Sequence, residues 1–268
     1  MKADFHVHSN YSDGSSSVNE IMQSARNNGV KYLSIVDHDT VEGLPEMLQL
    51  GEEFGIKVIP GIEISAYDFK RKLKVHVLGY NYNSNPVHIK SICQPLLERR
   101  HLHSLWQMKQ IESAGYSLNM EAVLETAKPG QTVYKQHIMA HLTDEPFSSI
   151  EYKQLYRKLF KGGGVASGDI EYLNAFDAVQ AIVKDGGVAV VAHPGQLDSY
   201  DLIPELVEAG LGGIERNHMD HTAEDHHRVE ALARRYNLIM TGGTDYHGEF
   251  GPPADIGEIE SPLNHLCR

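Results

Sequence analysis

The chain has 268 residues, 41% of them hydrophobic and 22% charged, which is the composition of a soluble globular protein. Its formal net charge of −12 argues against a protein that grips duplex DNA by neutralising many phosphates. No apolar run approaches the roughly 18 residues of a membrane span, and no basic segment leads into an apolar one at the N-terminus, so we expect a cytoplasmic protein without a membrane partner.

Short apolar runs alternate with amphipathic helical segments in the first third of the chain. The predicted elements are strands at 3–5, 31–36, 56–60, 62–65 and 74–80 and helices at 18–28 and 44–54. Gly29 and Gly55 stand just past the two helices, as helix ends prefer. Repeated alternation of strand and helix predicts a parallel sheet or barrel with the helices outside.

The alternation stops between residues 85 and 168, where helix follows helix. The helices expected there are 86–114, with a potential break at Pro95, 120–127, 134–142 and 149–160. The strand and helix rhythm then resumes, with helices at 175–184, 202–209 and 223–236 and strands at 187–192, 213–216 and 238–242. We therefore expect a discontinuous barrel domain, residues 1–84 and 169–268, and a helical insertion, residues 85–168, that covers the active site.

Histidines and carboxylates stand at the ends of the predicted strands. His6 and His8 lie two apart on a strand, so both side chains project to one face. An isolated pair of this kind is as often structural as functional, but the similar ends at Asp37-His38-Asp39, His193 and Asp245-Tyr246-His247 favour a shared metal site. Loops after the strands of parallel β/α folds build active sites. Imidazole and carboxylate ligands together suit Zn, Mn and Fe.

These motifs make the chain similar to the polymerase and histidinol phosphatase (PHP) family of metal-dependent phosphoesterases. The matching segments are His6-Val7-His8-Ser9 with Ser12-Asp13-Gly14, Val36-Asp37-His38-Asp39-Thr40, Pro60-Gly61-Ile62-Glu63, His76-Val77-Leu78-Gly79, Ala192-His193-Pro194-Gly195, Gly213-Ile214-Glu215 and Thr244-Asp245-Tyr246-His247-Gly248. The resemblance implies a distorted (β/α)7 barrel with a helical insertion and a site for two or three divalent ions, Mn, Fe or Zn, at its C-terminal face.

The resemblance also implies which residues hold the ions. One ion would be held by His6, His8, Glu63 and Asp245, a second by Glu63, His76 and His193, and a third by Asp13, His38 and His247. Glu63 would bridge the first two. We expect catalysis to depend on His38, Glu63, His193 and Asp245, with a metal-bound hydroxide attacking the phosphorus.

The resemblance narrows the substrate to a small phosphorylated metabolite, with a nucleoside 3',5'-bisphosphate as the best single expectation. The alternatives are a 5'-3' exonuclease on short RNA, a histidinol phosphate phosphatase, a hydrolase of esters that lack phosphorus, and a non-catalytic metal-stabilised binding module. Relatives of the nucleotide-directed subgroup carry Arg-x-His-Ile-Ala in the insertion, whereas this chain has Lys135-Gln136-His137-Ile138. Lysine binds phosphate as a point charge without the bidentate fork of arginine.

Five residues are candidate substrate contacts: Lys135, His137, Asp39, Arg216 and His221. For Arg216 an ion pair with a nearby acid is an equal alternative, and for His221 a place in a surface loop. Arg99 and Arg100, on a predicted helix, are expected to face solvent. Tyr134 is a candidate for stacking on a base. The sequence leaves open the substrate, the metal, the number of ions bound and the oligomeric state.

Overall fold

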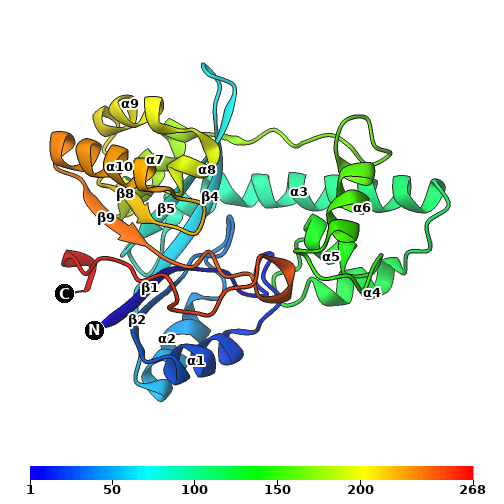
Figure 1. The fold of residues 1–268 in the computed structure, drawn as a ribbon, viewed down its shortest axis with the longest axis horizontal. Helices are drawn as coiled ribbons and strands as arrows, with labels where there is room; N and C mark the ends of the chain where they lie inside the picture. The colour runs from blue at the N-terminus through cyan, green and yellow to red at the C-terminus, as the bar shows by residue number, and fades with distance from the viewer. Residues whose placement is uncertain (268) are drawn as a thin grey trace.

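The computed structural model describes residues 1–267 and has an α/β fold in which the strands form two sheets (Figure 1). The smaller sheet is parallel and has the order β1 (Lys2–Val7), β2 (Val30–Ile35), β3 (Lys57–Val58). The larger sheet has the order β6 (Leu173–Asn174), β4 (Gly61–Asp68), β5 (Leu73–Tyr80), β7 (Val188–Val191), β8 (Gly213–Asn217), β9 (Ile239–Gly242). Isolated bridges join Val7 to Tyr246 and His38 to Glu63.

The larger sheet is mixed, and the expectation of parallel strands throughout is wrong at β5. This strand runs antiparallel to both β4 and β7, whereas the other neighbours in the two sheets are parallel. The reason is the turn at residues 69–72, which makes a hairpin of β4 and β5 and is too short to hold a crossover helix. The two sheets and their bridges establish the α/β class, and the closed (β/α)7 barrel stays a prediction.

Helices cover the outer faces of both sheets. α1 (Val18–Asn27) and α2 (Leu44–Phe54) bury one face against the smaller sheet. α7 (Ala175–Lys184), α9 (Ile203–Glu208) and α10 (Ala223–Tyr236) do the same on the larger sheet. The bounds of α2, α7 and α10 agree with the prediction, because strong caps mark them: Gly55 ends α2 in the left-handed conformation, and Asn174 and Thr222 cap α7 and α10. The short α8 (Pro194–Leu197) and β6 were not predicted.

The predicted helical insertion consists of α3 (Val87–Ser113), α4 (Met120–Thr126), α5 (Lys135–Met139) and α6 (Ile150–Phe160). α3 continues through Pro95 without the predicted break. Its first half packs on the larger sheet through Ile89 and Cys93, and its second half joins the insertion's own apolar core through Met108 and Ile111. Figure 1 shows α3 running from the sheets to the group of α4, α5 and α6 at its far end. The insertion therefore has an apolar core of its own, and the division of the chain at residues 85 and 168 stays a prediction.

None of the helices within residues 1–267 combines the length and the apolar character that crossing a membrane requires.

Candidate metal centre

All nine predicted metal ligands converge at one place between the two sheets. Their side chains form three overlapping groups, and within each group the potential ligand atoms lie within 4.8 Å of one another. The groups are His6, His8, Glu63 and Asp245; His8, Asp13, His38 and His247; and His38, Glu63 and His76. The ninth predicted ligand, His193, is outside these groups, but its Nε2 lies 3.1 Å from Glu63 Oε1. The resemblance predicted this set of residues, and the structure places His8 and His38 in two groups each rather than in one.

Glu63, in β4, is the centre of the cluster and is completely buried. Its Oε1 lies 2.9 Å from His76 Nδ1 and 3.1 Å from His193 Nε2, and its Oε2 lies 3.2, 3.1 and 3.4 Å from the Nε2 atoms of His6, His8 and His38. Burial alone would raise the pKa of this carboxyl, but the surrounding histidines hold its pKa well below the ordinary value. A carboxylate with both oxygens among imidazoles has the geometry that the predicted bridging role needs.

The donor atoms fit divalent metal ions. His8 Nδ1 and Nε2, His38 Nδ1 and His193 Nδ1 are buried and have no hydrogen-bond partner among the described residues. Buried polar atoms are normally satisfied, so such a group of unpartnered nitrogens is unusual in a protein interior. Asp13, Glu63 and Asp245 also bring three carboxylates together, which a bound cation would neutralise. Mixed imidazole and carboxylate ligands suit Mn, Fe and Zn.

Strained backbone supports three of the site residues. Asp39, His193 and Asp245 have positive φ angles of 61°, 23° and 50°, a region that residues other than glycine rarely occupy. Such conformations cost about 1–3 kcal/mol each and persist when the surroundings impose them. The His193 amide donates to Glu215 Oε2 at 2.8 Å, and the Asp39 amide donates to the Glu63 carbonyl at 2.9 Å. The fold therefore holds these loops in the geometry that the cluster requires.

Carboxylates behind the ligands orient them, and the sequence did not assign them this role. Glu215, in the middle of β8, accepts from His6 Nδ1 at 2.9 Å, which leaves His6 Nε2 to face the cluster. Asp37 accepts from the Ser9 amide at 2.8 Å and so shapes the loop that carries Asp13. Asp4 accepts from the Thr244 hydroxyl at 2.7 Å beside Asp245. The sequence showed that Glu215 and Asp37 belong to motifs near predicted strand ends, but it did not show their hydrogen-bond partners.

The insertion reaches the cluster through α5 and the residue before it. Gln136 donates to Asp13 Oδ2 at 2.9 Å, a contact that the sequence did not reveal. The Tyr134 hydroxyl donates to the His38 carbonyl at 3.0 Å, so Tyr134 is buried against the centre. The neighbouring His137 is fully buried, and its Nδ1 accepts from the Tyr134 amide at 3.1 Å. Burial lowers the pKa of His137 to about 4.

Arg100 of α3 does not face solvent as expected. Its Nη2 donates to Asp39 Oδ2 at 2.7 Å and to Ser65 Oγ at 2.9 Å, and its guanidinium carbon lies 4.9 Å from the centre of the Tyr134 ring. Asp39 Oδ1 accepts from the Ser65 amide at 2.7 Å. Both Asp39 oxygens thus have partners inside the protein, and a contact of Asp39 with substrate stays a prediction.

Two other predicted substrate contacts are engaged within the protein. Arg216 pairs with Glu230 of α10 at 2.5 Å, the ion pair that the sequence left open. His221 accepts from the Gly195 amide at 3.1 Å and donates to the Arg216 carbonyl at 2.8 Å, so both of its ring nitrogens are used. Its neighbour His218, for which the sequence indicated no role, lies with Nε2 3.3 Å from Asp245 Oδ2.

A cavity of about 340 Å³ opens over the cluster. Metal ligands from Asp13 to His247 form one side of it, and Lys74, Arg100, His103, Lys135, Tyr156, Asp169 and Tyr172 lie among its other walls. Its volume is in the range of sites for small molecules. Lys135 is therefore the predicted substrate contact that the structure places in the cavity wall.

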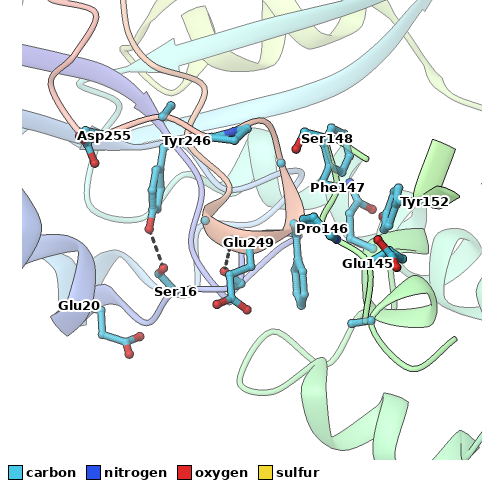
Figure 2. Close-up of a pocket in the computed structure, with 18 of the residues that line it drawn as sticks. Ser16, Glu20, Glu145, Pro146, Phe147, Ser148, Tyr152, Tyr246, Glu249 and Asp255 are labelled. Atoms are coloured by element: carbon cyan, nitrogen blue, oxygen red, sulfur yellow. Dashed lines mark hydrogen bonds between the residues drawn. The ribbon is translucent and has the colours of Figure 1, made fainter. Parts of the chain in front are cut away.

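A larger cleft of about 1100 Å³ lies on the other side of Gln136, between the insertion and the loops that follow β1 and β9. Figure 2 shows its walls, with Ser16 and Tyr246 hydrogen-bonded on the sheet side and Glu145 and Tyr152 on the insertion side. Every charged residue that lines this cleft is acidic: Glu20, Asp144, Glu145, Glu249, Asp255 and Glu258. We call it the acidic cleft.

Comparison with known proteins agrees with this site. The PHP domain family model matches residues 4–184. A phosphoribosyl 1,2-cyclic phosphate 1,2-diphosphodiesterase of Eggerthella lenta is 51% identical over 96% of this chain and 98% of its own length. A 3',5'-nucleoside bisphosphate phosphatase of Chromobacterium violaceum is 29% identical over 99% of this chain and 93% of its own. The solved structure of a protein described as a metal-dependent phosphoesterase, from Bifidobacterium adolescentis, superimposes with a TM-score of 0.86 at 26% identity, covering 97% of this chain and 92% of its own.

Proposed function

The chain belongs to the PHP domain family and is a metal-dependent phosphoesterase, and from this premise we propose that it hydrolyses a cyclic phosphodiester of a phosphorylated ribose. The observation that carries the proposal is the identity of 51% with the cyclic phosphate diphosphodiesterase along almost the full length of both chains. The bisphosphate phosphatase, at 29%, is a more distant relative. The cyclic ester therefore replaces the nucleoside 3',5'-bisphosphate, which the sequence favoured, as the first candidate.

The proposed cofactor is two or three divalent ions, Mn, Fe or Zn, held by the nine converging ligands. Ions bound at such a site supply a nucleophile at neutral pH and neutralise charge on the phosphoryl oxygens. In the proposed reaction, water adds to phosphorus, one P–O ester bond of the ring breaks, and a proton ends on the released ribose hydroxyl. This opening of the ring yields a phosphate monoester.

The protein's own residues would orient the site and the substrate. Glu63 links the histidines of both sheets, and Glu215 fixes His6 with Nε2 facing the cluster. Asp37 and Asp4 hold the loops that carry Asp13 and Asp245. Lys135 places a positive charge in the cavity wall for phosphate oxygens. These groups are fixed by hydrogen bonds before substrate arrives, which is the preorganisation that electrostatic catalysis needs.

A substrate panel tests the proposal. Protein reconstituted with Mn, Fe or Zn is incubated with phosphoribosyl 1,2-cyclic phosphate, a nucleoside 3',5'-bisphosphate, a 5'-phosphorylated short RNA and histidinol phosphate, and the products are followed by phosphorus NMR. We expect kcat/KM for the cyclic ester to exceed the others by at least about tenfold, since tenfold corresponds to only about 1.4 kcal/mol of transition-state binding. A higher kcat/KM for any other member would contradict the proposal.

The nucleoside 3',5'-bisphosphate stays as the second candidate, because the relative of that name covers 93% of its own length at 29% identity. Both substrates are small and carry a second phosphate, so they would use the same cavity. In the panel above, faster hydrolysis of the bisphosphate than of the cyclic ester would favour this second candidate.

A further inference from the structure

The cavity over the metal ligands has a second polar end, built by residues outside the metal centre. Lys74 comes from β5, His103 from α3, Lys135 from the start of α5, and Asp169 and Tyr172 from the segment that follows the insertion. We call these five residues the Lys135 pole. They come from separate parts of the chain, so the fold rather than local sequence brings them together.

Lys135 has no carboxylate partner within residues 1–267, although its side chain is partly buried. Burial lowers the pKa of its ammonium group to about 8, and the charges of Lys74, Lys161 and Arg100 act in the same direction, against that of Asp169. A desolvated ammonium without a counter-ion is costly in a protein interior. An anion from outside would relieve that cost.

The acid of the cavity wall whose charge acts on Lys135, Asp169, is already engaged. Its Oδ2 lies 2.5 Å from Lys74 Nζ, and its Oδ1 accepts from the Tyr172 hydroxyl at 2.6 Å. Lys74 Nζ also donates to the Tyr172 oxygen at 3.1 Å and so closes a triangle. Because both Asp169 oxygens have partners, the triangle holds Lys74 at the cavity wall, and Asp169 acts on Lys135 only through space, without an ion pair.

A further unsatisfied polar atom stands in the same wall. His103 lines the cavity, and its Nε2 is buried without a hydrogen-bond partner in the described part of the chain. Arg100, by contrast, is committed to Asp39 and Ser65. The other cavity that meets Gln136, the acidic cleft, has only acidic residues among its charged walls. Of these two spaces, only the cavity with Lys135 offers cations to a phosphate.

We propose that the Lys135 pole binds a second, non-reacting phosphate of the substrate, while the phosphorus under attack lies over the metal ligands. This inference rests on the proposed function and extends it, because it assigns the phosphate that a phosphorylated ribose carries outside the cyclic ester. Lys135 donates to that phosphate, His103 does so in the tautomer that carries its proton on Nε2, and the triangle of Asp169, Lys74 and Tyr172 keeps a second cation beside it. The Lys135 pole is therefore the part of the cavity that selects a sugar with this second phosphate over a sugar without it.

The test compares two cyclic esters that differ only in this phosphate: phosphoribosyl 1,2-cyclic phosphate and ribose 1,2-cyclic phosphate. We expect the wild type to favour the phosphorylated ester by about 10- to 100-fold in kcat/KM, the effect of a charge-assisted contact. Lys135→Met should lose most of that preference, and Lys135→Arg should keep more of it. Lys153→Met, which removes an exposed lysine of the insertion outside the cavity, should retain the wild-type preference.

Lys135→Met removes a desolvated charge, so we expect the variant to fold, and its thermal unfolding curve will show whether it does. Tyr172→Phe is a second test. It removes the hydroxyl that donates to Asp169 Oδ1, and because the freed oxygen is available to Lys135, the preference should also fall. Equal rates on the two esters in the wild type, or an undiminished preference in Lys135→Met, would overturn the inference and leave the proposed function intact.

If neither cyclic ester is hydrolysed, the proposed function fails, and a nucleoside 3',5'-bisphosphate and the matching 3'-monophosphate become the probes. The same loss of preference in Lys135→Met then supports the pole. If the wild type shows no preference for the bisphosphate over the 3'-monophosphate, or hydrolyses neither, the proposed role of the Lys135 pole is overturned as well.

Discussion

At the scale of single residues, the cluster of candidate metal ligands could be predicted from the sequence, but the groups behind them could not. His6, Glu63 and Asp245 belong to short motifs at predicted strand ends, and these are brought together as the resemblance implied. Gln136 carries no such mark, because a glutamine on a helix is ordinarily a solvated residue. Its contact with Asp13 depends on how the insertion packs, which a single sequence does not record.

Glu215 gives a prediction at this scale. Replacing it with Gln removes the carboxylate that accepts from His6 Nδ1 and from the His193 amide. We expect metal affinity to fall by about 10- to 100-fold, as for other partners of metal-bound histidines. Titration of the metal-free protein with Mn or Zn, followed by calorimetry, measures the change.

Glu230→Gln is the matched control, because Glu230 pairs with Arg216 outside the cluster. Its metal affinity should equal that of the wild type. An unchanged affinity in Glu215→Gln would show that Glu215 does not orient His6.

At the scale of elements, propensity and capping predicted most helix bounds. The direction in which β5 pairs and the face of α3 that is buried did not follow from the sequence. α2 and α10 begin and end where predicted, because their caps are local features of the chain. The direction of β5 was predicted wrongly, since an apolar run has the same pattern in a parallel and an antiparallel strand. α3 was expected to be exposed, yet its Arg100 lies against the metal centre, because tertiary packing decides which face of a helix is buried.

The contact of α3 with the metal centre gives a second prediction. Arg100→Met leaves the buried Asp39 carboxylate without its guanidinium partner, which typically costs about 3–5 kcal/mol. Asp39 follows His38 directly, and Tyr134, beneath the guanidinium, holds the His38 carbonyl. We therefore expect Arg100→Met to lower both the free energy of unfolding in urea and the affinity for metal.

The double variant Arg100→Met with Asp39→Asn tests whether the lost unfolding free energy comes from the unpaired charge of Asp39. Asparagine tolerates the positive φ at residue 39 and carries no charge, so the double variant should regain more than half of the lost unfolding free energy. If the double variant instead loses as much unfolding free energy as Arg100→Met and Asp39→Asn lose in sum, a direct coupling of Arg100 and Asp39 is contradicted.

At the scale of the whole molecule, the net charge of −12 argued against duplex DNA as a partner but did not show where the charge lies. The structure concentrates acidic residues in the larger cleft, whose walls Figure 2 shows, and places Lys135, which has no carboxylate partner within residues 1–267, in the wall of the smaller cavity. This separation depends on the packing of the insertion against the loops after β1 and β9, which brings together residues far apart in the sequence. The sequence predicted the insertion, but not the two spaces beneath it.

The acidic cleft gives a third prediction. An RNA strand leaving the metal centre through this cleft would meet like charges, which slow the approach of a polyanion. Replacing Asp144, Glu145 and Glu249 together with Asn, Gln and Gln should raise the cleavage of a 5'-phosphorylated short RNA by about tenfold at low salt. The gain should shrink as salt screens the exposed charges.

Glu53, Glu98 and Glu112, exposed glutamates that do not line the cleft, changed to Gln together, form the control and remove the same net charge. An equal rise in RNA cleavage in the control would assign the effect to net charge alone. No rise in either variant would remove the acidic cleft as a barrier to RNA.

The central claim is that the nine converging side chains, linked through Glu63, hold the ions on which hydrolysis depends. The most direct test measures metal content by mass spectrometry and turnover of phosphoribosyl 1,2-cyclic phosphate in parallel, in wild type, in metal-stripped wild type and in Glu63→Gln. We expect two or three ions per chain in the active wild type, loss of turnover on stripping with recovery on adding Mn, Fe or Zn, and joint loss of metal and turnover in Glu63→Gln. Full turnover by the metal-stripped protein, or by a Glu63→Gln variant without bound metal, would contradict it.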